Sequence, residues 1–328
     1  MKKSMLLVLL LSPILLFPQN MSKEAQDYKD LVMEYANNYL TPIQQDVLQN
    51  HYCGPECYST YVNGEYVPWD KESSDIKVLD EISTVVHEST HHFFRSGWDT
   101  MNFVVSDSRF ISVPKTKIFK SNLIVNDMLK RNPKVKDMFR FDTYVNTTIN
   151  MCSSTSGIYG LMNEYCAYYN GALSALILYE VFKDKHAENE EDVNYYNASS
   201  EEKFFRDIEK ELALKMMSSV AAFYQFNSFI GAYLMYAKEN YHDIYIDILN
   251  NSLLVESYSI VTYNFSVIAE KTHEYFPENN FKRFSETGSA RVIYGNNESL
   301  LLSQEIFNDY INVLNQFSNS TNLLLTKK

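Results

Sequence analysis

Residues 85–92 read VVHESTHH, and this stretch decides how the rest of the chain is interpreted. It contains the pattern His-Glu-x-x-His, in which His87 and His91 are four residues apart and therefore lie on one face of a helix. Two imidazole nitrogens in that arrangement can reach one zinc ion, and Glu88 is placed to deprotonate a metal-bound water. The stretch therefore predicts a zinc site on a helix, with a third ligand elsewhere in the chain.

The flanking residues predict the helix that carries this pattern. Ser73 or Ser74 can cap its first turn, and Gly97 can end it after Ser96. Both histidines of the pattern then lie well inside regular structure, where the backbone holds ligands rigidly. The next histidine, His92, points about 100° away around the helix, so we do not expect it to bind the same ion. Apolar residues recur at helical spacing, namely Ile76, Leu79, Ile82, Val85, Val86, Phe93 and Phe94.

A second helix is predicted over residues 156–183, and its small residues are as informative as its large ones. Gly160, Ala167 and Gly171 lie on the same helical face as Glu164, so another backbone can approach this carboxylate closely. A lone glutamate in an apolar helix is costly to bury without a partner. Either metal ligation or a buried Arg or Lys would satisfy Glu164.

His87, Glu88, His91 and Glu164 together resemble the gluzincin group of zinc metallopeptidases, in which a His-Glu-x-x-His helix and a glutamate on a second helix hold the metal. The resemblance is limited to these positions. It implies a zincin-like fold, one Zn²⁺ per chain held by His87, His91 and Glu164, Glu88 as the general base, and a peptide or protein substrate. Two features of this chain differ from those of the best-known gluzincins. His91 and Glu164 are 73 residues apart, and Tyr168 stands where an acidic residue often follows the third ligand.

Two further assignments complete the predicted site. Asp99 and Asp107 are alternative third ligands, although Asp107 is expected on a strand and turn. A developing oxyanion needs a neutral or positive hydrogen-bond donor, and we select Tyr159 because it lies just over one turn before Glu164. The other candidates for this donor are Tyr144, Tyr168, His273 and Arg291.

The composition indicates a packed globular protein with an acidic balance. The chain has 328 residues, of which 45% are hydrophobic and 14% aromatic, so it is long enough to bury a large core. Its formal net charge is −12 at pH 7. Binding to a nucleic-acid backbone requires an excess of Lys and Arg, which this chain lacks, so we expect no nucleic-acid partner.

The beginning of the chain is typical of an export signal. Lys2 and Lys3 precede an apolar stretch from Met5 to Phe17, so we predict a signal peptide over residues 1–19, with an uncleaved anchor as the alternative. No later stretch offers 18 uninterrupted apolar residues. We therefore expect an exported protein, secreted, periplasmic or at the cell surface, with no membrane span in the mature chain.

Export to an oxidising compartment would allow the cysteines to form disulfides. Of the three connectivities that four cysteines permit, we favour Cys53 with Cys57 and Cys152 with Cys166. A zinc site built from all four cysteines is the alternative, although their spacing contains no paired C-x-x-C motif.

We predict an α+β fold that is predominantly α-helical, with residues 20–328 forming a single zincin-like catalytic domain whose C-terminal part is helical. Residues 102–114 alternate between polar and apolar and predict one or two strands with a turn at Asp107-Ser108, forming a small sheet beside the His-Glu-x-x-His helix. Further helices are predicted at 23–40, 122–130, 241–254, 256–274 and 299–314. Another begins at residue 201, and its apolar part, residues 223–237, is expected to be buried in the core.

These features predict, first, an exported zinc-dependent metallopeptidase that hydrolyses peptide bonds with Glu88 as general base. The alternative is a non-enzymatic exported protein that binds peptides or a surface partner, with structural zinc or none, since aromatic residues enrich both cores and binding surfaces. A third function is a zinc hydrolase that acts on a substrate other than a peptide, because the metal and the base would serve any carbonyl.

Overall fold

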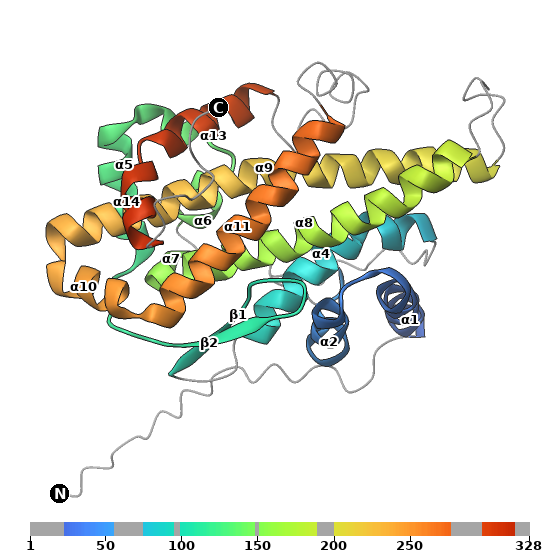
Figure 1. The fold of residues 1–328 in the computed structure, drawn as a ribbon, viewed down its shortest axis with the longest axis horizontal. Coiled ribbons are helices and arrows are strands. Elements are labelled where there is room, and N and C mark those ends of the chain that lie inside the picture. Colours follow the sequence, from blue (N-terminus) through green and yellow to red (C-terminus); the bar gives the residue numbers. More distant parts are fainter. Residues whose placement is uncertain are drawn as a thin grey trace, which may run out of the picture.

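A computed structural model describes residues 23–55, 75–94, 99–147, 151–188, 200–276 and 297–318. The described chain is predominantly helical and carries a two-stranded antiparallel sheet, as predicted (Figure 1). The elements are α1 (Lys23–Tyr39), α2 (Pro42–His51), α4 (Asp75–Phe94), β1 (Thr100–Val104), β2 (Phe110–Pro114), η1 (Ser121–Ile124), α5 (Val125–Arg131), η2 (Pro133–Asp137), α6 (Phe141–Tyr144), α7 (Cys152–Thr155), α8 (Gly157–Glu188), α9 (Ser200–Asn240), α10 (His242–Asn250), α11 (Ser252–Tyr275), α13 (Asn297–Asn308) and α14 (Ile311–Phe317).

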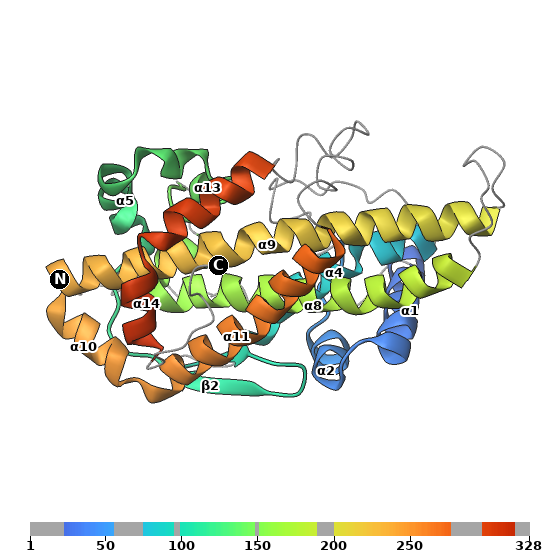
Figure 2. The same ribbon diagram turned by 45° about the horizontal axis from the view of Figure 1, so that its top comes forward.

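Two long helices, α8 and α9, form the centre of the fold. They run side by side along the long axis of the molecule, and α11 lies across both of them (Figures 1 and 2). The second half of α9 is apolar from Phe223 to Ala237 and almost entirely buried, which confirms the predicted core helix. Burying this much apolar surface on all sides of a helix requires neighbours all round, and α4, α8, α11, α13 and α14 supply them.

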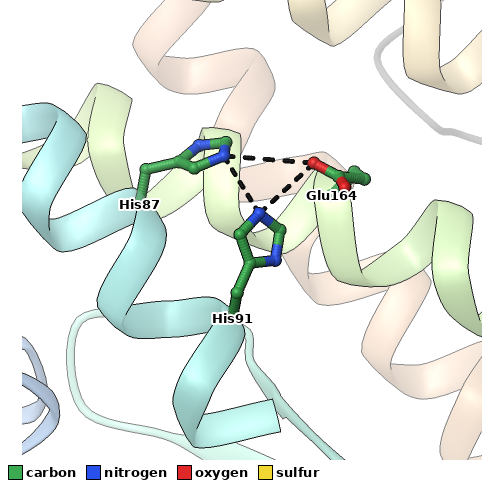
Figure 3. A group of neighbouring side chains, drawn as sticks. All are labelled: His87, His91 and Glu164. Carbon is green, nitrogen blue, oxygen red and sulfur yellow. Dashed lines mark hydrogen bonds and ion pairs between the residues drawn. The ribbon is translucent and has the colours of Figure 1, made fainter. Parts of the chain in front are cut away.

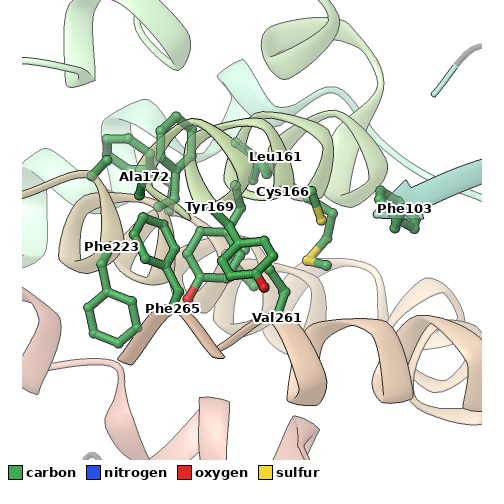
Figure 4. Close-up of a cluster of buried hydrophobic side chains, with 14 of the residues drawn as sticks. Phe103, Leu161, Cys166, Tyr169, Ala172, Phe223, Val261 and Phe265 are labelled. Carbon is green, nitrogen blue, oxygen red and sulfur yellow. The ribbon is translucent and has the colours of Figure 1, made fainter. Parts of the chain in front are cut away.

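The core between α8, α9 and α11 is aromatic and contains one buried polar network. Phe223 and Phe265 pack with ring centroids 5.5 Å apart, and both are visible in Figure 4. Asn227 donates to the Tyr165 hydroxyl over 2.8 Å and accepts from the Tyr258 hydroxyl over 2.6 Å. Because each of these hydroxyls has a partner, the three helices bury polar groups without the cost of leaving them unsatisfied.

The sheet lies beside α4, the helix that carries the His-Glu-x-x-His pattern. β1 and β2 pair in antiparallel register from Thr100 opposite Pro114 to Val104 opposite Phe110. Phe103 on β1 packs against Phe94 at the end of α4, with ring centroids 5.2 Å apart. The predicted pair of strands with a connection at Asp107-Ser108 is therefore confirmed.

Several helix boundaries differ from the predicted ones. α2 was not predicted, and the helices predicted at 241–254 and 256–274 divide instead at Asn251, whose side chain accepts from the backbone N–H of Leu254 and caps α11. The predicted signal peptide and the residues predicted to cap or end α4 lie outside the described residues. Among the described helices, none is both long enough and apolar enough to cross a bilayer.

The predicted disulfide between Cys152 and Cys166 is wrong, because Cys166 is a free and buried thiol. The backbone carbonyl of Cys152 lies directly against Gly160 on α8. Cys166 is six residues further along the same helix, a rise of about 9 Å, whereas the Cα atoms of a disulfide lie within about 7 Å. Cys166 instead faces the core near Phe103 (Figure 4). The predicted Cys53–Cys57 pair involves a residue outside the described ones.

We expect Cys166 to react with iodoacetamide only after the protein unfolds. Burial raises the pKa of its thiol, so the reactive thiolate is disfavoured in the folded state. Alkylation of the native protein should be slower than that of the unfolded chain by roughly 10³-fold or more, the ratio of folded to unfolded molecules in a typical domain. Mass spectrometry of the peptide containing Cys166, labelled in denaturant without reductant, checks this. A peptide that takes up label only after reduction would show that Cys166 is in a disulfide.

Candidate metal centre

Three predicted ligands meet at the contact between α4 and α8. His87 and His91 project from one face of α4, one turn apart, and Glu164 projects toward them from α8 (Figure 3). One ligand atom from each residue lies within 4.8 Å of the others. The helix spacing of the two histidines and the glutamate on a second helix therefore produce the cluster that the sequence predicted.

The distances in this cluster suit a small divalent cation. His87 Nε2 is 3.1 Å from His91 Nε2, while Glu164 Oε2 is 3.3 Å from His91 Nε2 and 3.9 Å from His87 Nε2. Tetrahedral ligands at about 2.0 to 2.2 Å from a zinc ion are separated from each other by about 3.3 to 3.6 Å. The observed separations bracket that range, so small side-chain adjustments suffice to surround one ion.

The cluster is largely shielded from solvent and incompletely satisfied. The side chain of Glu164 is 6% exposed, and those of His87 and His91 are 12% and 16% exposed. Glu164 Oε2 and His91 Nδ1 are buried and make no hydrogen bond within the described part of the chain, although Glu164 Oε2 lies 3.3 Å from His91 Nε2 as an ion pair. A carboxylate oxygen of this kind is costly to bury, and a bound cation would satisfy it.

The two imidazoles differ in charge. Burial, the neighbouring His91 and the Arg140 guanidinium hold the pKa of His87 well below its usual range, so His87 is neutral. Burial also lowers the pKa of His91, but the Glu164 carboxylate outweighs it and raises that pKa to about 9. His91 therefore carries a proton at the centre of the cluster near neutral pH, and a metal ion would replace it.

His87 is held in the orientation that a metal ligand needs. Its ring donates a hydrogen bond to the backbone of Ala167 on α8, and its Nε2 faces His91. Metal-binding histidines commonly use their second nitrogen in this way, because a carbonyl acceptor fixes the tautomer. The rings of Tyr168 and His87 also form a T-shaped pair, with centroids 4.5 Å apart.

Glu88 lies at the edge of a cavity beside the cluster. Glu88 Oε1 is 4.0 Å from His87 Nε2, and the Glu88 side chain is 31% exposed. Both residues line a cavity of about 200 Å³ together with Thr84, Arg140, Tyr144 and Tyr168. Burial raises the pKa of Glu88, and the Glu164 carboxylate contributes to the rise. A carboxylate here is close to the three possible ligands but outside their group, which is the position that a general base would need.

Two tyrosines in the cavity can donate hydrogen bonds. The hydroxyls of Tyr144 and Tyr168 lie 2.9 Å apart, so one donates to the other and one hydroxyl proton is left for a further acceptor. Burial, Tyr168 and Glu164 raise the pKa of Tyr144 well above its usual range, which keeps its hydroxyl protonated. Both residues were named as alternatives for the oxyanion donor.

The selection of Tyr159 as the oxyanion donor is wrong. Its side chain is buried, and its hydroxyl accepts from the Thr116 backbone N–H over 2.8 Å and donates to the Pro114 carbonyl over 3.2 Å. Asn251 also donates to it. Tyr159 thus ties β2 to the start of α11, and it does not line the cavity beside the metal ligands.

The remaining alternatives also lie away from the cluster. Asp99 and Asp107 are exposed and do not belong to the group of possible ligands that the described residues form, and neither does His92. Arg291, a further candidate donor, lies outside the described residues. His273 lies on α11 and does not line the cavity.

Gly171 explains how Glu164 reaches the histidines. A Cβ atom at Gly171 would lie 2.9 Å from the backbone carbonyl oxygen of Ser83 and 3.5 Å from His87 Cβ. Of the small residues predicted around Glu164, Gly171 therefore lies where α4 rests on α8, whereas Gly160 lies against α7. Because the neighbour is backbone, a larger residue at this position would push the two helices apart.

We expect Gly171→Ala to weaken zinc binding by about 10-fold or more, an effect typical of changes just outside a metal's ligands. Gly231→Ala is the matched control, since its Cβ would lie 2.5 Å from Tyr310 Cβ, on α9 and outside the ligand group. Each variant should lose about 1 to 3 kcal/mol of stability through overpacking. Zinc titration and denaturant unfolding of both variants check this. Equal zinc affinity in the two variants would contradict the role assigned to Gly171.

Two cations in the cavity were not predicted. Arg140 and Lys215 both line it, and Arg140 is 3% exposed. Nothing in the local sequence distinguishes Arg140, which stands between two phenylalanines ahead of α6. Its burial results from contacts with α8 and α9, both distant in the sequence.

Comparison of the chain with protein-family models, with curated proteins and with solved structures finds no match in any of the three.

Proposed function

We propose that this protein is an exported zinc-dependent metallopeptidase of the gluzincin type, built on a zincin-like helical domain. The observation that supports it most is the convergence of His87, His91 and Glu164 from two helices beside a cavity that Glu88 lines. Two imidazoles and one carboxylate are a ligand set of catalytic zinc, which keeps a fourth position for water. The proposed export rests on the apolar stretch near the beginning of the chain.

In this proposal each residue around the cluster has a separate role in hydrolysis. Zinc, when bound by His87, His91 and Glu164, supplies an electrophile for the scissile carbonyl and lowers the pKa of water. Glu88 takes a proton from the attacking water and passes it to the leaving amine. The pKa of Glu88, which burial raises, suits both halves of this transfer. The Tyr144–Tyr168 pair donates its remaining hydroxyl proton to the developing oxyanion.

Zinc content and peptide hydrolysis, measured together, test the proposal. We expect about one zinc per chain and cleavage of unstructured peptides, which a chelator abolishes and added zinc restores. Zinc binding without hydrolysis of any substrate would favour a non-enzymatic peptide-binding protein. Hydrolysis confined to substrates other than peptides would favour a different zinc hydrolase. A chain that binds no zinc after zinc is supplied would exclude both zinc hydrolases and leave the non-enzymatic protein.

A further inference from the structure

Arg140 is a buried cation whose guanidinium forms no ion pair within the described segments. Its side chain is 3% exposed and lies just before α6. No carboxylate of the described residues lies within 4.0 Å of its guanidinium, the distance of an ion pair. By contrast, Arg109 and Arg131, which are both more exposed, pair with carboxylates. A buried arginine normally requires such a partner, because removing the charge from water is costly.

The hydrogen bonds of Arg140 leave part of its guanidinium unused. One terminal nitrogen, Nη2, donates to the carbonyl and the hydroxyl of Ser218, over 3.3 and 3.0 Å. The other, Nη1, donates to Gln225 Oε1 over 3.4 Å. The third nitrogen, Nε, is buried without an acceptor in the described part of the chain. Since an arginine has five N–H donors, two of them have no acceptor here.

The position of Arg140 relates it directly to the metal ligands. Its guanidinium lies over the ring of Tyr168, with Cζ 4.5 Å from the ring centroid, and the centroid of the His87 ring lies 4.5 Å from the same point. The cation and this histidine are therefore at most about 9 Å apart. Arg140 and Glu88 line the same cavity, so a molecule that reaches the base can also reach the guanidinium.

The rest of the cavity wall near Arg140 suits an anion. Lys215 adds a second positive charge, which is 3.7 Å from Asp80 Oδ1, and Ser218 and Ser219 add hydroxyl groups. The Tyr168 face interacts favourably with the guanidinium, yet a cation–π contact supplies no acceptor for the unused N–H groups. This cationic wall is unexpected in a chain whose formal net charge is −12.

We propose that Arg140 binds a carboxylate group of the substrate, next to the bond that is cleaved. This inference rests on the proposed peptidase function and specifies its substrate class. A guanidinium N–H makes a strong, charge-assisted hydrogen bond to a carboxylate oxygen, and the donors of Arg140 that have no acceptor allow such a contact. His87 and the guanidinium are at most about 9 Å apart, whereas three residues of extended chain span about 10 Å, so the carboxylate belongs to one of the two residues beside the scissile bond.

This carboxylate has two chemical sources, and hydrolysis distinguishes them. A free C-terminal α-carboxylate would make the protein an exopeptidase that releases one or two residues. A side-chain carboxylate would make it selective for Asp or Glu within a longer peptide. The zinc-loaded wild type is therefore given three peptides of one sequence: the free acid, its C-terminal amide, and the amide with one Gln replaced by Glu. Preference for the free acid identifies the first source, and preference for the Glu-containing amide identifies the second.

A binding experiment on the zinc-free chain tests the inference independently of hydrolysis. The probes are N-acetylglycine and N-acetylglycinamide, which differ in the carboxylate alone, and the readout is the shift in Tm on titration. We expect the acid to bind the wild type more tightly than the amide by about 10- to 100-fold, the effect of one charge-assisted hydrogen bond. Arg140→Met should abolish the difference, and Arg140→Lys should reduce it.

Arg131→Met is the matched control, because Arg131 is paired with Asp127 and Glu239 on the surface and is not in the cavity. It should retain the preference for the acid. Circular dichroism establishes that each variant is folded, and Arg140→Lys serves if Arg140→Met is not. Equal binding of acid and amide by the wild type, or an unchanged preference in both Arg140 variants, overturns the inference. Failure to cleave any of the three peptides, together with retained acid binding, overturns the proposed function instead.

Discussion

Replacing Glu88 with glutamine is expected to lower kcat/KM for peptide hydrolysis by about 10²- to 10⁴-fold, the contribution of a general base. Glutamine has nearly the same shape but binds no proton at neutral pH. Glu88 lines the cavity and is 4.0 Å from His87 Nε2, yet it does not belong to the group of possible metal ligands. Zinc content should therefore remain at about one per chain, and the loss should lie in kcat rather than in KM.

Glu81→Gln provides the matched control for this prediction. Glu81 lies two helical turns before Glu88 on α4, and burial raises its pKa as well, so the same change of residue is made in a similar setting. Its carboxylate accepts a hydrogen bond from the Tyr28 hydroxyl over 3.1 Å, and a glutamine can accept the same bond. Steady-state kinetics should find wild-type rates in Glu81→Gln. Full activity in Glu88→Gln would refute the assignment of the base, and loss of zinc in that variant would make Glu88 a ligand.

The prediction that His87 and His91 lie together depends on helix geometry alone. His87 and His91 share a face because they are four residues apart on a helix, whatever surrounds them. Glu164 was found through the small residues around it, and the contact of Gly171 with the Ser83 carbonyl is the physical reason that this signal worked. Close approach of two helix backbones requires a residue without a side chain, so the glycine that permits it can be recognised in the sequence.

The part that was wrong or missed depends on contacts between distant segments. Tyr159 was chosen for its position one turn before Glu164, but its hydroxyl is satisfied by Pro114, Thr116 and Asn251. The sequence of α8 does not show that these three residues lie next to the Tyr159 hydroxyl. Arg140 was missed for the same reason, since only the folded chain places it over Tyr168. A tertiary contact decides the role of a long polar side chain, and helical periodicity carries no information about it.

The omission of α2 is of a different kind, because a local signal was present. Thr41 caps this helix by accepting from the Gln44 backbone, the Gln44 side chain accepts from the Thr41 backbone, and Pro42 begins the first turn. Thr-Pro-x-Gln is a capping box with proline in its favoured position. The helix α2 is short and its apolar pattern is weak, so the spacing of apolar residues did not reveal it. For this helix the capping residues are the better predictor.

Replacing Glu164 with alanine is expected to weaken zinc binding by at least about 100-fold, more than the loss typical of residues outside the ligand set. The side chain contributes one of three converging ligand atoms and is 6% exposed. Two histidines one turn apart would remain, and two ligands hold zinc much less tightly than three. Glu180→Ala is the matched control, because Glu180 lies on the same helix and pairs with Lys271 and Tyr275 outside the cluster.

Unfolding with and without zinc separates this prediction from a purely structural role for Glu164. If Glu164 and protonated His91 formed only a buried ion pair, removing the carboxylate would destabilise the protein by about 3 to 5 kcal/mol, and zinc would have no effect on either form. If the three residues bind zinc, the wild type gains about 2.7 kcal/mol at a free zinc concentration of 100 times Kd, and Glu164→Ala gains much less. Denaturant unfolding of wild type, Glu164→Ala and Glu180→Ala, each with zinc and with chelator, distinguishes the two. A wild type that zinc does not stabilise would mean that His87, His91 and Glu164 converge as a buried ion pair alone.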